Sequence, residues 1–383
     1  MNFDLNEEQT MVRKMAHDFA EKEMLPTLLD CERRREVNLT LIQKMASQGL
    51  LGVHLPQKYG GMEAGYVTAS IVWEQLSRAS WTQTLISLGH AVLAGTILSK
   101  VANEEQKQKY LPDLCNGSLI VAMAAVEPNV GSDASAVETK ATLDGDTWII
   151  DGSKNFITAG NLADVVLVLV QTNKDLGPKG LALIAVEKEV SGFTATPAEM
   201  VGGWASDISN LSFMECRVPK ANLIGDIGRG LQNALIGIDT ARLFVAAGAI
   251  GMAQSCLDAC VKYAKERYQF KRPIGGFQLI QETIARMYAE IEATRWQVYY
   301  AADLKSKNAP HAKELSAAKW LSSELAVRVG AEAIRLHGAY GCTNEYLVEH
   351  HYRDAIMSTI LGGTSEMHKL TIGRELLGIN ALS

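Results

Sequence analysis

The sequence predicts an α+β protein with an N-terminal helical domain, a central antiparallel β-barrel or sandwich, and a C-terminal four-helix bundle. Two changes of pattern carry this prediction. The helical period stops near Cys115, where short apolar runs separated by Gly, Asp and Asn turns begin. The helical period returns after the glycine-rich stretch Gly225–Gly230. We therefore expect domains over residues 1–117, 118–228 and 229–383.

The N-terminal third contains two helix starts of the same type. Asn6 and Asn103 are each followed three residues later by a glutamine that can bond back to the cap. An apolar period over Leu39–Leu50 predicts a further helix. The segment Ala69–Lys100 is expected to be helical throughout, and its many small residues allow close packing or leave room for a ligand.

The central third reads as short strands at even spacing, which is typical of a small antiparallel barrel or sandwich. Leu143–Asp146 predicts a hairpin turn before the next strand. Further strands are expected at Val165–Val170, Leu181–Val186 and Leu211–Phe213.

The C-terminal third is again helical. Leu243–Cys260 is apolar on nearly every face, which predicts a helix buried inside a bundle. Further helices are expected over Gln278–Lys305, His311–Arg335 and Arg353–Leu377. The neighbours His350 and His351 are interpreted as surface residues rather than metal ligands, because adjacent side chains point different ways on a helix.

Composition excludes several classes of function. The chain has 383 residues and a net charge of -6, which argues against non-specific nucleic-acid binding. No stretch approaches ~20 uninterrupted apolar residues, so no membrane span is expected. The N-terminus lacks a basic leader and an apolar signal core, which predicts a cytoplasmic protein. The six cysteines include no C-x-x-C pair, and we expect no metal site.

Two strand ends carry residues that suit a flat ligand. The run Leu119–Val126 leads into a turn with Gly131 and Ser132, which let a flat or phosphorylated ligand approach the backbone. A second run ends in the ring of Phe156 and the hydroxyl of Thr158. This pattern suits a flat heterocycle held by hydrogen bonds at its edge, and it equally suits an ordinary pair of turns in a β domain.

Several motifs occur in order at fixed spacings. They are Val126–Asp133, Asp151–Thr158, Arg267–Phe270 followed by Phe277–Gln278, and Tyr352–Ala355 leading to Gly363–Glu366. With these motifs the chain resembles the acyl-CoA dehydrogenase family over essentially its whole length.

The resemblance implies an FAD enzyme that acts on a CoA thioester, passes electrons to an electron-transferring flavoprotein, and forms a homotetramer built as a dimer of dimers. In the family pattern, one subunit would contact the flavin through Ala125, Val126, Phe156 and Thr158, with Gly131 and Ser132 beside them. Other FAD contacts, several to the cofactor of a neighbouring subunit, would come from Arg267, Phe270, Gln278, Arg335, Ala339, Thr364 and Glu366. The thioester would pass Ser132, Asp239 and Arg242, with its acyl group near Gly362 and Gly363.

The sequence departs from the family pattern where the catalytic base is expected. The usual base is a glutamate directly before the Gly-Thr of the last motif, and Gly362 stands there. Some members carry the glutamate on a bundle helix just before an arginine, and Ala241 stands there. Val126, Arg335 and Ala339 also replace residues that are common near the cofactor.

Two chemistries follow from the missing glutamate. The first is dehydrogenation of an unusual thioester, cyclic or branched, with a relocated base. His90 is the candidate, because its ordinary pKa of ~6.5 suits a base near neutral pH. The alternative is that His90 is a packed, hydrogen-bonded histidine of its helix. Relatives that act on cyclic thioesters use an aspartate from this region for 1,4-elimination, and no aspartate stands beside His90.

The second chemistry needs no base. A relative that desulfinates a sulfinyl thioester also lacks the glutamate and uses an arginine beside the leaving group. No arginine stands at the matching place near Leu85, and Arg78 lies about two turns earlier. A non-redox lyase of this kind, or a silent flavin- and CoA-binding homologue, remains the alternative function.

Overall fold

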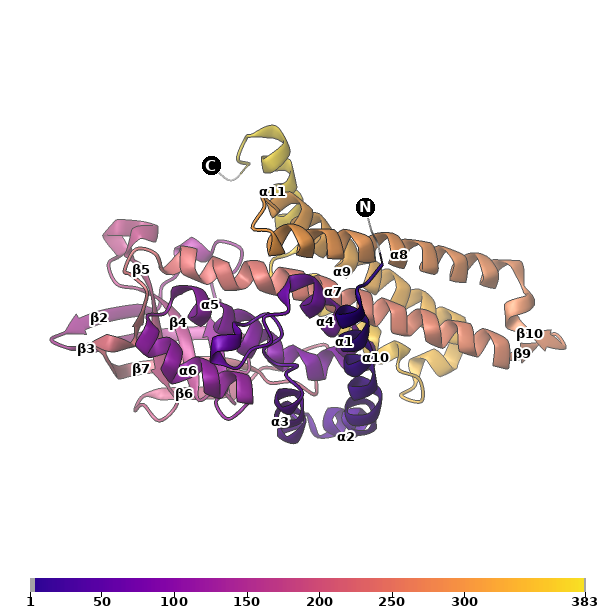
Figure 1. Ribbon diagram of the computed structural model, residues 1–383, viewed down its shortest axis with the longest axis horizontal. Helices are drawn as coiled ribbons and strands as arrows, with labels where there is room; N and C mark the ends of the chain where they lie inside the picture. Colours follow the sequence, from indigo (N-terminus) through magenta and orange to yellow (C-terminus); the bar gives the residue numbers. More distant parts are fainter. Residues whose placement is uncertain (1–3, 382–383) are drawn as a thin grey trace.

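The computed structural model describes residues 4–381 and shows three parts that follow one another along the chain (Figure 1). The first part is helical and lies over the middle of the molecule. Its helices are α1 (Glu7–Phe19), η1 (Ala20–Met24), α2 (Leu25–Arg34), α3 (Leu39–Ser47), α4 (Gly65–Ser87), η3 (Leu88–Gly95), α5 (Thr96–Val101) and α6 (Glu104–Asn116). The two predicted starts are confirmed, because α1 and α6 each begin with a capping box at Asn6 and Asn103.

The second part is an eight-stranded sheet with the order β6-β7-β3-β2-β4-β5-β8, and β1 pairs with β4. Its strands are β1 (Val121–Ala124), β2 (Lys140–Asp144), β3 (Thr147–Thr158), β4 (Val165–Gln171), β5 (Leu181–Glu187), β6 (Phe193–Pro197), β7 (Ile208–Pro219) and β8 (Leu223–Ile224). The predicted antiparallel β domain is confirmed for most strand pairs, while β1 and β2 each pair in parallel with β4.

The third part is a helical body that ends in a small hairpin. It contains α7 (Gly230–Glu266), β9 (Tyr268–Gln269), β10 (Arg272–Pro273), α8 (Gln278–Ser306), α9 (Ala312–His337), α10 (Val348–Ser358) and α11 (Ser365–Leu377). The β9–β10 hairpin lies at the end of the molecule opposite the sheet, and α11 projects from its side (Figure 1). The predicted single helix over Arg353–Leu377 is interrupted, because Gly362 and Gly363 have φ values of 71° and 108°.

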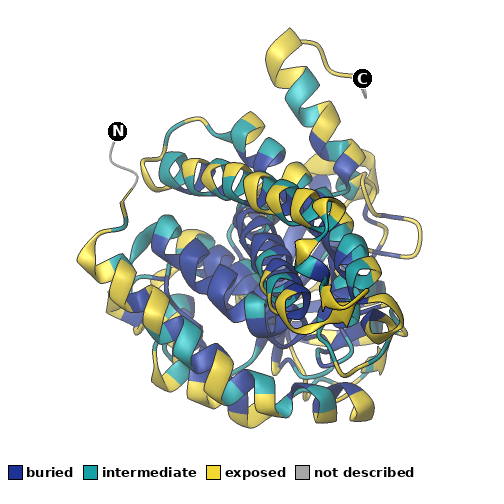
Figure 2. Cartoon of the chain, turned by 90° about the vertical axis from the view of Figure 1, so that its right-hand side faces the viewer, coloured by how far each residue is buried: buried dark blue, intermediate teal, exposed yellow. Residues whose placement is uncertain are grey.

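Helices α4 and α7 form the centre of the fold, and the buried residues gather on the helices inside the body (Figure 2). By length and composition alone, the stretches Gly65–Val101 and Gly230–Glu266 could cross a membrane. In the fold, 78% and 72% of their most apolar windows are buried against other elements. This burial is what core helices of a folded domain show.

The predicted unbroken helix over Ala69–Lys100 is broken in two ways. Ser80 has the extended angles φ -162° and ψ 107°, and its hydroxyl accepts the N–H of Gln83, which restarts the helix. The π-helical segment η3 then replaces α-helix from Leu88 onward. A Cβ on Gly89 would lie only 2.4 Å from the carbonyl oxygen of Thr158, so η3 touches β3 backbone to backbone.

The expectation that His350 and His351 lie on the surface is wrong. Both are 1% exposed. His350 Nδ1 lies 2.7 Å from Glu32 in α2, and Asp354 in α10 accepts the N–H of Gly203 from the β domain. Long-range partners bury this pair, and together these contacts join all three parts of the chain.

Gly89→Ala tests the close approach of η3 to β3. We expect this substitution to lower the free energy of unfolding by about 1–3 kcal/mol, because a Cβ cannot remain 2.4 Å from a carbonyl oxygen. Chemical denaturation of both proteins measures the difference. Gly373→Ala in α11 is the matched control, since a Cβ there meets nothing within 4 Å and should be neutral or slightly stabilising. Equal stability of G89A and the unsubstituted chain would contradict the contact.

Candidate active site

The two strand-end motifs meet in space. The N–H of Asn155 donates to the carbonyl of Val126 at 2.9 Å, which ties the turn after β1 to the end of β3. The β3–β7 register shifts between Lys154 and Ile157, and Phe156 adopts a φ of 59°. This bulge leaves Phe156 54% exposed, while Thr158 is only 7% exposed. The result is an exposed ring beside a sheltered hydroxyl.

A buried ion pair fixes this turn from behind. Lys154 Nζ lies 2.7 Å from Glu127 Oε1 and 3.2 Å from the carbonyl oxygen of Ala125. The Glu127 carboxylate also accepts the N–H groups of Glu138 and Thr139 at 2.7 and 2.9 Å. Burial lowers the pKa of Lys154 to about 8, although its hydrogen bond to Glu127 opposes that shift. The pair therefore connects β3, the turn after β1 and the start of β2.

The sequence analysis did not find this pair. Lys154 occupies an inward position of β3, in the same alternation as the buried Trp148 and Ile150. A lysine at an inward strand position needs a buried partner, and this was the available signal. Local sequence pattern does not indicate which carboxylate is the partner of Lys154.

The turn between α10 and α11 carries the predicted acyl site. Arg242 Nε in α7 donates to the Gly362 carbonyl at 2.9 Å, and Lys319 Nζ in α9 donates to the Gly363 carbonyl at 2.7 Å. A Cβ on Gly362 would have three atoms of Arg242 as its nearest neighbours, at 3.4–3.7 Å. Ala241, the second customary position for a base, is 3% exposed within α7. Neither position supplies an acid.

Asp239 lies one helical turn before Arg242 in α7 and is already neutralised. Its Oδ2 accepts from Lys305 and lies 3.0 Å from His311 Nε2. His311 Nδ1 lies 2.7 Å from the carbonyl of Ala309, so both ring nitrogens face oxygen acceptors and the imidazolium form satisfies both. The hydrogen bond to Asp239 raises the pKa of His311. This side of the turn therefore carries excess positive charge.

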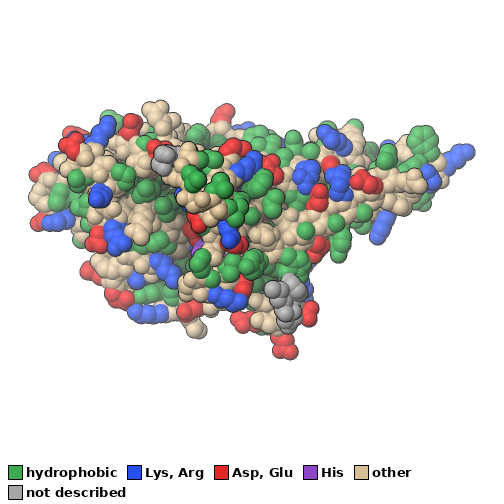
Figure 3. Space-filling view, turned by 90° about the horizontal axis from the view of Figure 1, so that it is seen from above, with side chains coloured by type: hydrophobic (Ala, Val, Ile, Leu, Met, Phe, Trp, Pro, Cys, Tyr) green, Lys and Arg blue, Asp and Glu red, His purple; other side chains and the backbone are tan. Residues whose placement is uncertain are grey.

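The remaining predicted cofactor residues lie apart from the strand ends. Arg267 and Phe270 belong to the β9–β10 hairpin, and Gln278 begins α8 beside it. Figure 3 shows that the molecule tapers toward this hairpin, whose tip carries basic side chains. Phe270 is 87% exposed. One chain does not bring the hairpin to the strand ends, because the hairpin lies at the end of the molecule opposite the sheet (Figure 1).

Four further predicted residues lie near the bundle. Arg335 lies in the last turn of α9, and Ala339 lies in the short helix η8 (Gly338–Cys342) that follows α9. Thr364 caps α11 by accepting the N–H of Met367 at 3.3 Å, and Glu366 is in the first turn of that helix. The cap and the start of α11 are thus next to Gly362–Gly363.

His90 is enclosed by backbone partners, as a packed helix histidine would be, and its role as a base stays a prediction. Its Nε2 lies 3.0 Å from the carbonyl oxygen of Leu114, and its Nδ1 accepts the N–H of Val121 at 3.2 Å. These partners fix the neutral tautomer with the proton on Nε2. Burial lowers the pKa of His90 to about 4, and the side chain is 1% exposed. His90 therefore joins η3, α6 and β1, and it has no free lone pair.

The residues at the strand ends fit FAD. Val126 and Phe156 are 36% and 54% exposed, which is unusual for apolar side chains at sheet ends and suits contact with a flat ring. A Cβ on Gly131 would meet nothing within 4 Å, so the neighbouring turn leaves the backbone open to a ligand. Within residues 4–381, no three His, Cys, Asp or Glu side chains are grouped as metal ligands.

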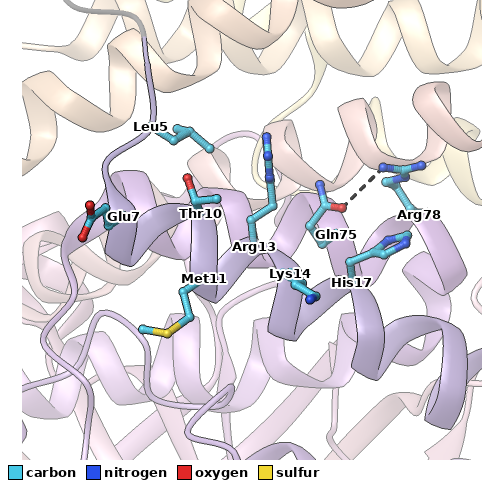
Figure 4. Close-up of a pocket in the computed structure, with 9 residues that line it drawn as sticks. All are labelled: Leu5, Glu7, Thr10, Met11, Arg13, Lys14, His17, Gln75 and Arg78. Carbon is cyan, nitrogen blue, oxygen red and sulfur yellow. Dashed lines mark hydrogen bonds between the residues drawn. The ribbon is translucent and has the colours of Figure 1, made fainter.

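A separate surface groove of about 790 Å³ lies between α1 and α4 (Figure 4). Arg78 and Gln75 are hydrogen-bonded at its edge, and Arg78 also pairs with Asp258 at 2.6 Å. Its lining residues include none of the predicted cofactor or substrate residues.

The whole chain is similar to known proteins of one family. Models of the acyl-CoA dehydrogenase N-terminal, middle and C-terminal domains match residues 6–118, 122–216 and 228–377. An acyl-CoA dehydrogenase of Bacillus subtilis is 38% identical over 98% of this chain and 99% of its own. The caffeyl-CoA reductase-Etf complex subunit CarC of Acetobacterium woodii is 36% identical over 97% of this chain and 99% of its own.

Solved structures agree closely with the fold. The butyryl-CoA dehydrogenase of Megasphaera elsdenii has a TM-score of 0.95 and 34% identity, and the match covers 98% of this chain and 100% of that one. A glutaryl-CoA dehydrogenase of Mycobacterium smegmatis in complex with FADH2 has a TM-score of 0.95 and 27% identity, over 99% of this chain and 97% of that one.

A helical domain, a sheet and a second helical body, with a flat-ligand site at the strand ends, define a flavoprotein oxidoreductase. The chain belongs to the acyl-CoA dehydrogenase family, which acts on the CH–CH group of acyl-CoA thioesters. The predicted family, three-part fold and FAD cofactor are confirmed.

His90→Gln separates a structural role from a role as base. Glutamine keeps a donor for the Leu114 carbonyl but leaves the Val121 N–H without its acceptor. We expect a loss of about 1–3 kcal/mol in unfolding free energy and an unchanged rate of flavin reduction by any thioester that reduces the parent protein. A folded, FAD-loaded H90Q protein that such a thioester no longer reduces would contradict the structural role and restore His90 as the base.

The Lys154–Glu127 pair predicts that removing one charge lowers the free energy of unfolding more than removing both charges does. Lys154→Met alone leaves the Glu127 carboxylate buried and unpaired, which should cost about 3–5 kcal/mol of unfolding free energy. The double variant with Glu127→Gln removes both charges, and we expect it to be more stable than K154M. Denaturation of the two variants and E127Q completes the cycle. Additive effects would show that the two side chains do not interact.

Proposed function

We propose that this chain is an FAD-dependent oxidoreductase for the CH–CH group of an unusual CoA thioester, cyclic or branched, without the customary catalytic glutamate. One observation carries the proposal. The turn that would hold the glutamate is clamped by Arg242 and Lys319, and it presents Gly362 at the position of the glutamate. The absent side chain leaves room beside the acyl group, which favours a bulky substrate.

The proposed roles of the site residues follow from their places in the fold. Val126, Phe156 and Thr158 would hold the flavin at the strand ends, with Ala125, Gly131 and Ser132 in the adjoining turn. Bound FAD supplies the oxidant that takes up hydride from the substrate. Arg242 would orient the thioester beside Gly362. The base would lie at neither customary position, and His90 is occupied by backbone partners.

The exposed hairpin supports a subunit contact. Phe270 and Leu279 are 87% and 80% exposed, and Leu376 and Leu377 at the end of α11 are also exposed. Apolar residues gathered at two protrusions suit burial against other copies. We propose a homotetramer, built as a dimer of dimers, in which Arg267, Phe270, Gln278, Arg335 and Ala339 reach the FAD of a neighbouring subunit. Thr364 and Glu366 would bind near its adenosine half.

The proposed electron acceptor is an electron-transferring flavoprotein, and the proposed location is the cytoplasm. The related CarC protein is a subunit of a caffeyl-CoA reductase-Etf complex, which supports this class of partner.

Anaerobic reduction tests the proposed function. The purified flavoprotein is mixed without oxygen with a panel of straight, branched and cyclic acyl-CoA thioesters, and the visible flavin band is followed. We expect bleaching by at least one branched or cyclic member. A flavin that no saturated thioester bleaches would instead support the lyase or silent-homologue alternative, and a chain that binds no flavin after reconstitution would reject both.

Gly362→Glu tests whether a carboxylate at position 362 is sufficient for reduction of the flavin by an ordinary straight-chain thioester. A Cβ at this position makes ordinary contacts, although its left-handed φ costs a side chain about 1–2 kcal/mol. We expect G362E to be bleached by butyryl-CoA much faster than the parent protein, because a carboxylate returns to the customary place. Gly362→Gln has the same size and strain without the base. Equal bleaching of G362E and G362Q, both loaded with FAD, would contradict the proposal.

A further inference from the structure

Three nitrogen-bearing side chains surround the Gly362–Gly363 turn. Arg242 and Lys319 donate to its two successive carbonyl groups, at 2.9 and 2.7 Å. His368 lies on the third side, and a Cβ on Gly363 would be 3.3 Å from its Nε2. His368 is 2% exposed, and this Nε2 has no hydrogen-bond partner in the described part of the chain. The turn therefore lies inside a cluster of donors with spare capacity.

The positive charge of this cluster is not balanced by direct ion pairs. Among residues 4–381, neither Arg242 nor Lys319 has a carboxylate within salt-bridge distance, and both contact only backbone oxygens of the turn. The Asp239 carboxylate is used by Lys305 and His311, and Glu324 accepts the hydroxyl of Ser365.

The local field affects the titration of the neighbouring groups. Burial, and then the charge of Arg242, lowers the pKa of Lys319 to about 7. Burial, followed by the charges of Lys319 and Arg242, lowers the pKa of His368 to about 3. Buried charge is normally paired or neutralised in proteins, so near neutral pH His368 is neutral, Lys319 is partly neutral, and Arg242 carries the positive charge of the cluster.

One member of the cluster can reach a ligand. Lys319 is fully buried behind the turn, whereas Arg242 is only partly buried. Arg242 uses Nε for the Gly362 carbonyl, and its two Nη groups make no hydrogen bond or ion pair within the described residues. The space over Gly362 is bordered by Arg242 itself. A guanidinium edge without a partner among the described residues thus lies beside the Gly362–Gly363 turn, where its Nη2 is 3.9 Å from a Cβ built on Gly363.

We propose that this space takes a carboxylate carried by the acyl group of the substrate, bound by the Arg242 guanidinium over Gly362. The inference rests on the proposed function and names the substrate class for it: a carboxyacyl-CoA thioester. A planar guanidinium fork matches a carboxylate with two parallel hydrogen bonds. The carboxylate would supply the negative charge that a glutamate at position 362 would otherwise bring, and such a glutamate would repel it.

The test uses pairs of thioesters that differ only at the end of the acyl chain. The FAD-loaded protein is titrated anaerobically with succinyl-CoA against butyryl-CoA, and with glutaryl-CoA against valeryl-CoA, by following the change in the flavin spectrum. We expect the carboxylated member of at least one pair to bind about tenfold more tightly, in line with ~1.4 kcal/mol for a charge-assisted contact. Both members share the CoA moiety, so CoA contacts cancel in the ratio.

Variants at position 362 provide the second measurement. G362E should reverse the preference, because its carboxylate repels the acyl carboxylate and pairs with Arg242. G362Q should reduce the affinity for both members without reversing their order. Equal affinity for the two members of every pair, or an unchanged ratio in G362E, would overturn the inference. A flavin that responds to none of these four straight-chain thioesters rejects this inference and leaves the proposed function to the panel of branched and cyclic thioesters, and equal responses likewise reject only the inference.

Discussion

Lys154 and Glu127 form an ion pair that is closed to solvent at the junction of β1, β2 and β3. Glu127 accepts the N–H groups of Glu138 and Thr139, which lie directly before β2, and Lys154 donates to the Ala125 carbonyl. Burying such a pair gains little net stability, because desolvation offsets most of the attraction. The effect of the pair is to constrain geometry, because moving one side chain away would leave the other charge buried and unpaired. The turn after β1 and the bulge at Phe156 are thereby held in one arrangement.

The contact of η3 with β3 extends this arrangement into the helical domain. Gly89 permits the helix backbone to touch the Thr158 carbonyl, and His90 next to it bonds to both Leu114 and Val121. These contacts therefore join the end of β3, the π-helical segment η3, the helix α6 and the start of β1. The flat-ligand surface formed by Val126 and Phe156 rests on these joined elements, which explains how exposed apolar side chains keep a defined position.

The Gly362 turn shows how a family site changes while its scaffold remains. Arg242 and Lys319 hold both carbonyls of the turn from two different helices. This support fixes the backbone whether or not residue 362 carries a side chain. Gly362 places no carboxylate beside these two side chains, and neither Arg242 nor Lys319 has a carboxylate within salt-bridge distance among residues 4–381.

The sequence determined the features that depend on neighbours along the chain. The capped helix starts at Asn6 and Asn103, the three-part order and the strands at Val165 and Leu181 follow from local period and turn chemistry. The motif residues and the absence of glutamate at positions 241 and 362 could also be read directly.

Only the tertiary structure decided what each buried polar group does. His90 was predicted to be a base, but the backbone groups that occupy it belong to residues 24 and 31 positions away. His350 was predicted at the surface, and a carboxylate 318 positions away buries it. The partner of Lys154 and the charged groups around Gly362 likewise come from residues that are distant in the sequence. Local sequence cannot specify such partners, because a buried polar side chain takes its protonation state and role from groups that folding alone brings within hydrogen-bond distance.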